Sequence, residues 1–222
     1  MTTRVAVLSA NLGSYDPEVP WVAQVVPDPD VALEVHRFTD ANFPPRALAM
    51  TSRLQCGLMK MFGWQFVPDR DVYIWIDASR GLLRSDTVAW FLEQAGTADL
   101  LLFRHPERNT IREEYEFMKA RMARPGERYL NSRYVGEWLD EQYAAVSGGY
   151  VDDALYASTA FLYRNTLKVR AMLKEWWHHK SRYLLHDQLA LPYVVKRSAC
   201  TVKVISDSVY TSPHLPMTRG RR

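Results

Sequence analysis

The stretch DVYIWIDASRGLL, residues 71–83, is a run of apolar and β-branched side chains that stops at a single acid, Asp77. A short apolar run bounded by turn residues is typical of a buried strand. A carboxylate at the end of such a strand either caps the next turn or holds a positive charge. Two small residues, Ala78 and Ser79, follow the acid and leave space beside it. The stretch therefore predicts a central strand with a candidate site at its carboxyl end.

Short apolar runs alternate with longer helical patterns along the rest of the chain. Strands are predicted at 4–10, 33–38, 71–77, 98–103, 158–164 and 200–206, and helices at 45–64, 110–123, 165–180 and 182–196. This alternation predicts an α/β fold with a mostly parallel sheet flanked by helices, a Rossmann-like three-layer sandwich. No linker interrupts it, so we expect one domain over 1–222 with a C-terminal tail from about 211.

Local signals set some of the expected helix ends. Thr110 and Glu113 have the spacing of a capping box, and Asn165 is placed to cap the third helix. Pro192 lies inside the fourth pattern and should kink or end that helix.

Composition excludes several classes of protein. Of the 222 residues, 47% are hydrophobic and 24% charged, which is typical of a globular chain. A net charge of +3 is small for a dedicated nucleic-acid binder. Cys56 and Cys200 lack metal-type spacing and are expected to be buried thiols. No apolar run approaches the roughly 20 residues of a membrane span, and no signal peptide is evident, so we expect a cytoplasmic protein.

The loop after the first predicted strand has the side chains of a nucleotide pocket. It contains Asn11, Gly13, Tyr15 and Asp16. A glycine allows close approach of a ligand, a tyrosine ring can stack on a base, and Asn or Asp can bind its polar edge. The alternative is a plain strand-to-loop turn. The loop is not a phosphate loop, because it lacks the glycine patterns of those motifs.

The helix predicted at 45–64 carries a basic stripe. Arg46, Arg53 and Lys60 recur every seven residues, so they lie near one face of a helix. Such a stripe can neutralise a diphosphate, since arginine binds phosphate in a bidentate manner. The alternative is an ordinary solvated surface.

Asp77 and Ser79 are candidate ligands of a divalent cation. They form D-A-S, a reduced version of the D-x-D pattern in which two carboxylates hold a cation against a nucleotide diphosphate. Mn2+ or Mg2+ prefers such oxygen ligands and would complete its shell with phosphate and water. His214, near the C-terminus, is a candidate late ligand. A simple turn cap at Asp77 and an uninvolved histidine are the alternatives.

Two more segments carry side chains suited to catalysis or acceptor binding. Asp187 lies in an apolar pattern, where a buried acid must be paired or used, and Glu114 is the freer of two adjacent carboxylates. Either is a candidate general base. Candidate acceptor- or sugar-binding residues are His105, Arg108, Trp176 and Gln188. Ordinary packing, solvation or a backbone hydrogen bond is the alternative for each.

The order of these segments resembles one family. IWIDAS (74–79), FRHPERNTIREE (103–114), YASTAFLYRN (156–165) and HDQLALPY (186–193) follow the loop with Tyr-Asp and the basic helix. Together they resemble the bacterial and phage-type branch of a glycosyltransferase-like family of GT-A fold, long described as a domain of unknown function. Its plant members are linked to cell-wall and mucilage polysaccharides. The resemblance spans roughly residues 4–210.

The resemblance implies a transferase that moves a sugar from a nucleotide diphosphate sugar to a hydroxyl. It implies a nucleotide at the first loop and the basic helix, a cation near Asp77, and Asp187 on the acceptor side. The acceptor stays open among protein, glycan, small molecule and modified DNA. A non-catalytic nucleotide-sugar or nucleic-acid binding module and a nucleotide-sugar hydrolase remain alternatives.

Overall fold

The computed structural model describes residues 2–13, 16–43, 50–124, 138–151, 154–183 and 186–217. Its centre is a six-stranded sheet in the order β2-β1-β3-β5-β4-β6. The strands are β1 (Thr3–Asn11), β2 (Val31–Thr39), β3 (Val72–Ile76), β4 (Leu100–Arg104), β5 (Tyr156–Arg164) and β6 (Val202–Ile205). Each predicted strand is confirmed within a few residues at its ends.

The sheet is mostly parallel, as predicted. β1 pairs in parallel with β2 and β3, and β4 pairs in parallel with β6. β5 lies between β3 and β4 and is antiparallel to both. This α/β arrangement is consistent with the GT-A-like fold that the resemblance implies. Since β1 and β3 run in the same direction, their carboxyl ends meet at one edge, where α/β proteins commonly bind ligands.

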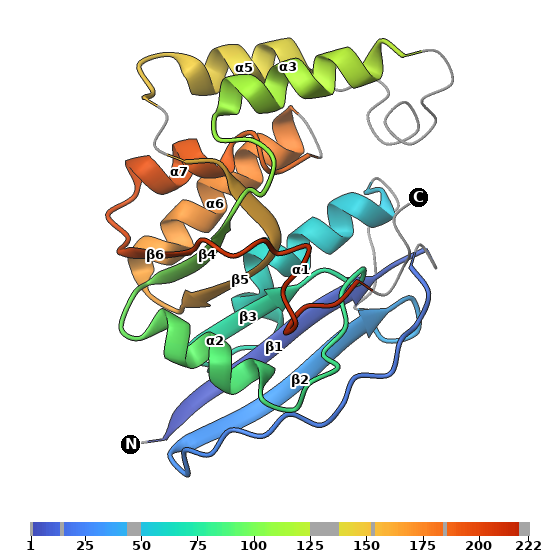
Figure 1. Ribbon diagram of the computed structural model, residues 1–222, viewed down its shortest axis with the longest axis vertical. Helices are drawn as coiled ribbons and strands as arrows, with labels where there is room; N and C mark the ends of the chain where they lie inside the picture. Colours follow the sequence, from blue (N-terminus) through green and yellow to red (C-terminus); the bar gives the residue numbers. More distant parts are fainter. Residues whose placement is uncertain are drawn as a thin grey trace.

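Helices cover both faces of the sheet (Figure 1). One face packs against α1 (Ser52–Phe66), α3 (Ile111–Met122), α5 (Leu139–Ser147), α6 (Leu167–Arg182) and α7 (Leu191–Arg197), and the other against α2 (Thr87–Ala95). Trp75, Phe161 and Trp176 belong to the core under α1 and α6, whereas Ile74 and Phe91 belong to the core under α2. Neighbouring strand residues thus face opposite cores, as a pleated strand requires.

The helix prediction was right for α3. The helix predicted at 45–64 corresponds to α1, Ser52–Phe66, and residues 45–49 lie outside the described part. Thr110 Oγ1 accepts a hydrogen bond from the Glu113 backbone N–H at 3.0 Å, so the predicted cap is confirmed. α6 is capped by Thr166, one residue after the predicted Asn165. The helix predicted over 182–196 was wrong, because α7 begins at Leu191 and Pro192 lies in its first turn. Proline lacks the N–H that this turn leaves unused. Helices α2 and α5 had no predicted counterpart.

A bulge in β5 lies next to the candidate site at the end of β3. Leu102 pairs with Phe161, but its neighbour Phe103 pairs with Ala157, so residues 158–160 bulge from the ladder. Bulges change the direction in which a side chain points. Here the bulge lies beside the end of β3, where the Asp77 backbone N–H donates to the carbonyl of Thr159 at 2.8 Å.

The chain returns to this region near its C-terminus. Met217 forms an antiparallel bridge with Arg80, and Leu215 is fully buried. Much of the predicted tail therefore packs on the domain, while residues 218–222 lie outside the described part. Among the described residues, no helix is long and apolar enough to cross a membrane.

Candidate functional site

Asp77 lies at the carboxyl end of β3 and reaches the surface. Its Oδ1 accepts a hydrogen bond from Trp75 Nε1 at 2.7 Å and faces Lys60 Nζ at 3.7 Å. The side chain is 38% exposed. Among the described residues, no hydrogen bond or ion pair involves Asp77 Oδ2.

Asp187, 110 residues further along the chain, belongs to the same cluster. Its Oδ2 lies 2.9 Å from Lys60 Nζ and 3.5 Å from Lys180 Nζ. Its Oδ1 accepts a hydrogen bond from Ser158 Oγ at 2.6 Å, which the bulge in β5 makes possible. We call Lys60, Asp77, Ser158, Lys180 and Asp187 the ionic cluster. It joins α1, β3, β5, α6 and the segment before α7.

Close packing of α1 on α6 brings the two lysines together. A Cβ on Gly57 would lie 2.2 Å from Lys180 Cε, so only glycine leaves room for the Lys180 side chain across α1. Trp176 Nε1 donates to the backbone carbonyl of Asp187 at 2.8 Å and holds that residue in place. The cluster is therefore supported by backbone and ring contacts as well as by charge.

The charges in the cluster shift the pKa values in different directions. Burial disfavours ionised Asp187, but the ammonium groups of Lys180 and Lys60 outweigh it and hold its pKa well below the usual value. Burial also lowers the pKa of Lys180. For Lys60 the neighbouring carboxylates outweigh burial and raise the pKa. Desolvation of the carboxylate raises the pKa of Asp77, although the positive charge of Lys60 opposes this shift. Asp187 is thus the firmly ionised carboxylate and Asp77 the one that holds a proton more readily.

The described residues of the loop after β1 are held by hydrogen bonds within the loop and with Asp40. Asn11 Nδ2 donates to the Asp16 carbonyl at 2.7 Å, and Asn11 Oδ1 accepts from the Asp16 backbone N–H at 3.0 Å. Gly13 has φ +74° and donates its N–H to Asp40 Oδ2 at 2.7 Å. Glycine is favoured in this left-handed region. Tyr15 lies outside the described residues.

A shallow cleft opens beside this loop at the carboxyl ends of β1 and β2. Its lining includes Asn11, Trp21, Arg37 and Ala78, the last being the neighbour of Asp77. The Arg37 guanidinium lies 4.9 Å from the centre of the Trp21 ring. The predicted nucleotide loop and the ionic cluster therefore lie along one edge of the sheet, with Ala78 between them.

The predicted basic stripe is not a surface feature at Lys60. Lys60 is buried in the ionic cluster, and Arg53 is half-buried near the start of α1. Arg46 lies outside the described residues. Tertiary packing turns Lys60 inward, so the binding of a diphosphate by this stripe stays a prediction.

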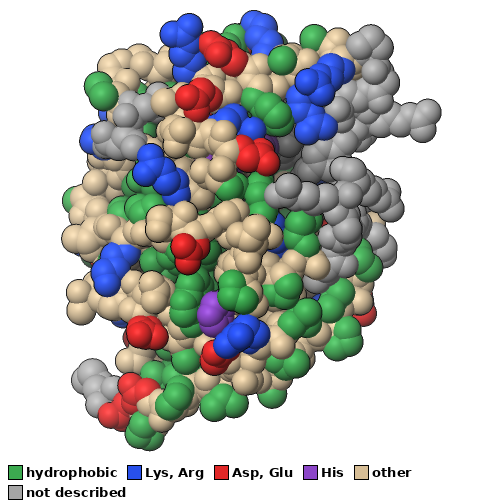
Figure 2. Space-filling view, viewed as in Figure 1, with side chains coloured by type: hydrophobic (Ala, Val, Ile, Leu, Met, Phe, Trp, Pro, Cys, Tyr) green, Lys and Arg blue, Asp and Glu red, His purple; other side chains and the backbone are tan. Residues whose placement is uncertain are grey.

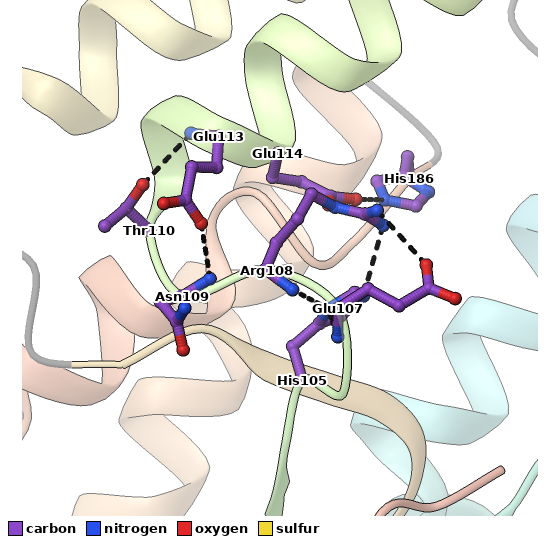
Figure 3. A network of polar contacts seen from close by, with 8 residues as sticks. All are labelled: His105, Glu107, Arg108, Asn109, Thr110, Glu113, Glu114 and His186. Carbon is purple, nitrogen blue, oxygen red and sulfur yellow. Dashed lines mark hydrogen bonds and ion pairs between the residues drawn. The ribbon is translucent and has the colours of Figure 1, made fainter.

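A second polar network follows β4 (Figure 3). Glu114, on α3, accepts a hydrogen bond from Arg108 Nε through its Oε2. Its Oε1 lies 2.6 Å from His186 Nε2. The backbone N–H groups of Glu107 and Arg108 donate to His105 Nδ1 at 3.2 and 3.0 Å. Burial disfavours the Glu114 carboxylate, but His186 and Arg108 outweigh it and lower its pKa to about 2. Glu114 is therefore a weak base.

The other predicted acceptor and metal residues lie in different surroundings. Trp176 is fully buried against Phe161, so it supports Asp187 and presents no open face to a sugar. Gln188 is half-buried beside Asp187. His214 stacks on Trp90 of α2, with ring centres 4.4 Å apart, and so belongs to the packing around α2.

The protein supplies few ligands for a cation. In the part of the chain that the structure describes, no three His, Cys, Asp or Glu side chains are grouped as a metal site. Asp77 offers a carboxylate oxygen, and Ser79 follows two residues later in the same turn. These residues fit a cation only if a diphosphate and water supply its remaining ligands.

Comparisons with known proteins give weak structural likeness and no match in sequence. No family model matches the chain, and no curated protein matches it. Among solved structures, a similar chain is described as "a glycosyltransferase involved in the glycosylation of the major capsid of PBCV-1". The two are 7% identical with a TM-score of 0.44, over 91% of this chain and 82% of that chain. A likeness at this level does not define a function.

Sequence reasoning missed several residues of the site. Ser158 and Lys180 gave no signal, because their contacts with Asp187 depend on packing between distant elements. Gly57 did give one, since a glycine inside a helix costs about 1 kcal/mol relative to alanine and usually has a packing reason. His186 directly precedes Asp187, and the sequence pattern singled out only the aspartate.

Proposed function

We propose that this protein is a glycosyltransferase that moves a sugar from a nucleotide diphosphate sugar to a hydroxyl acceptor. The observation that carries the proposal is the meeting of Asp77 and Asp187 around Lys60 at the carboxyl edge of the sheet. These acids come from two of the segments on which the family resemblance rests. The cleft beside the β1 loop adjoins them through Ala78. In this proposal the nucleotide binds along that edge, and the cleft widens to admit it, because its present space of about 10 Å³ holds only about one water molecule.

In this proposal the ionic cluster binds and orients the substrates. Asp187 stays ionised between two lysines and accepts a hydrogen bond from a sugar hydroxyl. Its low pKa suits binding better than removal of a proton. Lys60 contributes a fixed positive charge near the leaving diphosphate, where stabilisation of developing charge accelerates transfer. Glu114, enclosed by Arg108 and His186, acts outside this cluster.

A divalent cation fits beside Asp77 under the same proposal. Asp77 Oδ2 and the diphosphate would hold it, and Mn2+ or Mg2+ would neutralise charge on the leaving group. Lys60, near Oδ1, would then share that role from the protein side.

The alternative of nucleic-acid binding has no comparable support. On the face shown in Figure 2, the Lys and Arg side chains of the described residues are dispersed and interleaved with acidic ones. A continuous basic surface is typical of proteins that bind the phosphate backbone of a nucleic acid.

A thermal-shift panel tests the proposal. Uridine, guanosine, adenosine and thymidine diphosphates and their sugars are added with and without Mn2+ to the wild type, Asp77→Asn and Asp86→Asn. A ligand that binds the native state raises Tm. Asp86 is an exposed acid paired with Arg84 and serves as the matched control.

We expect one nucleotide to raise the Tm of the wild type and Asp86→Asn, and to have a weaker effect on Asp77→Asn. No shift with any nucleotide would contradict the proposal. Product analysis then separates transfer from hydrolysis, because a hydrolase releases free sugar at full rate without an acceptor.

A further inference from the structure

Glu114 and the ionic cluster are linked through two consecutive residues. Glu114 Oε1 faces His186 Nε2 at 2.6 Å, and the next residue, Asp187, places its carboxylate on Lys60 at 2.9 Å. The Glu114 side chain is 1% exposed. Figure 3 shows His186 pointing to Glu114 from the segment that precedes α7.

The other end of this link is the loop between β4 and α3. Arg108 Nε donates to Glu114 Oε2, and Arg108 Nη2 lies 3.2 Å from His105 Nε2. The Arg108 guanidinium also lies 3.8 Å from the centre of the Phe117 ring. These contacts fix the guanidinium from several sides. Glu114 therefore connects the loop between β4 and α3, through Arg108, with His186, the residue before Asp187.

We infer that Glu114 is a positioning residue, which sets the place of Asp187 in the ionic cluster by holding His186. A buried carboxylate held by an arginine on one oxygen and a histidine ring nitrogen on the other is a directional anchor. The segment that contains His186 and Asp187 lies between α6 and α7, outside regular helix, so it depends on such side-chain anchors. A role of Asp187 in binding substrate rests on the proposed function, but the link from Glu114 through His186 to Asp187 does not.

The test measures the ionisation of the two lysines of the ionic cluster in the protein without ligand. The pKa values of the Lys60 and Lys180 ammonium groups are measured by NMR of protein with 13C-labelled lysine, assigned with Lys60→Met and Lys180→Met. Lys60 owes its raised pKa to the nearby carboxylates, Asp187 first. If Glu114→Ala lets Asp187 move, the pKa of Lys60 falls, because burial, which lowers it, is then opposed by less negative charge.

Two control variants on α3 separate positioning from general damage. Glu116→Gln changes an exposed carboxylate paired with Arg112 and should leave Lys60 unchanged. Met118→Ala removes a buried apolar side chain one turn after Glu114 and lowers Tm, but it removes none of the polar groups of the network. We expect the pKa shift of Lys60 in Glu114→Ala and not in Met118→Ala.

The route through His186 is tested by combining variants. If Glu114 acts through His186, then His186→Ala shifts Lys60 as Glu114→Ala does, and the double variant shifts it no further. Independent shifts that add in the double variant would overturn this route. An unchanged Lys60 pKa in Glu114→Ala would overturn the inference itself. Neither readout needs a substrate, so a failure of the nucleotide panel remains a separate result.

Discussion

Lys60 Nζ lies between two carboxylates, 2.9 Å from Asp187 Oδ2 and 3.7 Å from Asp77 Oδ1. The two acids come from opposite halves of the chain, and a lysine on α1 joins them. Lys60, Lys180 and Asp187 are almost fully buried, whereas Asp77 is 38% exposed, so most of the charge in the cluster is balanced away from water. A balanced buried cluster of this kind is sensitive to the loss of any one member.

Removal of one charge from the cluster should destabilise the fold strongly. Asp187→Asn leaves two buried ammonium groups with one partner fewer, and we expect a loss of about 3 kcal/mol in the free energy of unfolding, measured in urea. Lys60→Met should cost a similar amount. Their double variant should lose clearly less than the sum, because only one buried ammonium group, Lys180, then lacks Asp187 instead of two. Fully additive losses would contradict the coupling.

An exposed ion pair provides the comparison. Asp86→Asn breaks the pair with Arg84, whose side chains are about half exposed. Such pairs contribute about 0–1 kcal/mol, so the same change of residue type should have little effect there.

Gly57→Ala should be destabilising although alanine favours helices. Its Cβ would overlap Lys180 Cε and push that side chain away from Asp187. The gain in helix propensity, about 1 kcal/mol, is expected to be smaller than the cost of the displaced charge. In urea unfolding, Gly57→Ala should cost much less stability in a Lys180→Ala background than in the wild type, because the side chain that it overlaps is then gone. If Gly57→Ala alone raises stability, Lys180 does not need that space.

His179 should make the protein sensitive to mild acid. Burial lowers its pKa to about 4 from an ordinary value of 6.5, and its Nδ1 has no hydrogen-bond partner among the described residues. The unfolded chain therefore binds a proton at a higher pH than the native protein does. Stability should be intact above pH 6.5 and should decrease as the pH falls from 6.5 to 4, by up to about 3 kcal/mol.

A phenylalanine in place of His179 should remove this part of the acid sensitivity. The measurement is the difference in Tm between pH 7.5 and pH 5 for the wild type, His179→Phe and His178→Phe. His178 is the exposed neighbour in the same helix and serves as the control. An undiminished difference in His179→Phe would show that other groups cause the acid sensitivity.

Asn11→Asp should weaken nucleotide binding with little loss of stability. Aspartate keeps the shape and can accept from the Asp16 N–H, but it cannot donate to the Asp16 carbonyl as Asn11 Nδ2 does. One lost hydrogen bond costs about 1 kcal/mol, or roughly a five-fold increase in Kd if the cost falls on the bound state. Titration of the nucleotide found in the panel measures this. An unchanged Kd would separate the loop from the nucleotide site.

The sequence by itself determined the strands, the α/β class and the edge of the sheet where the candidate site lies. Apolar runs and their turn residues are local signals, and DVYIWID predicted both β3 and the place of Asp77 at its end. Thr110 and Glu113 predicted the start of α3 for the same reason, since a helix cap involves residues three apart. The resemblance in motif order also came from sequence alone.

Tertiary structure alone decided which side chains meet. The antiparallel direction of β5 and its bulge bring Ser158 to Asp187, and the packing of α1 on α6 over Gly57 buries two lysines that a helix pattern would place in solvent. Pro192 began a helix that the pattern expected it to end, because the residues before it are held by side-chain contacts instead. Periodicity describes one element at a time, whereas the Lys60–Asp187 contact spans 127 residues and exists only when five elements pack together.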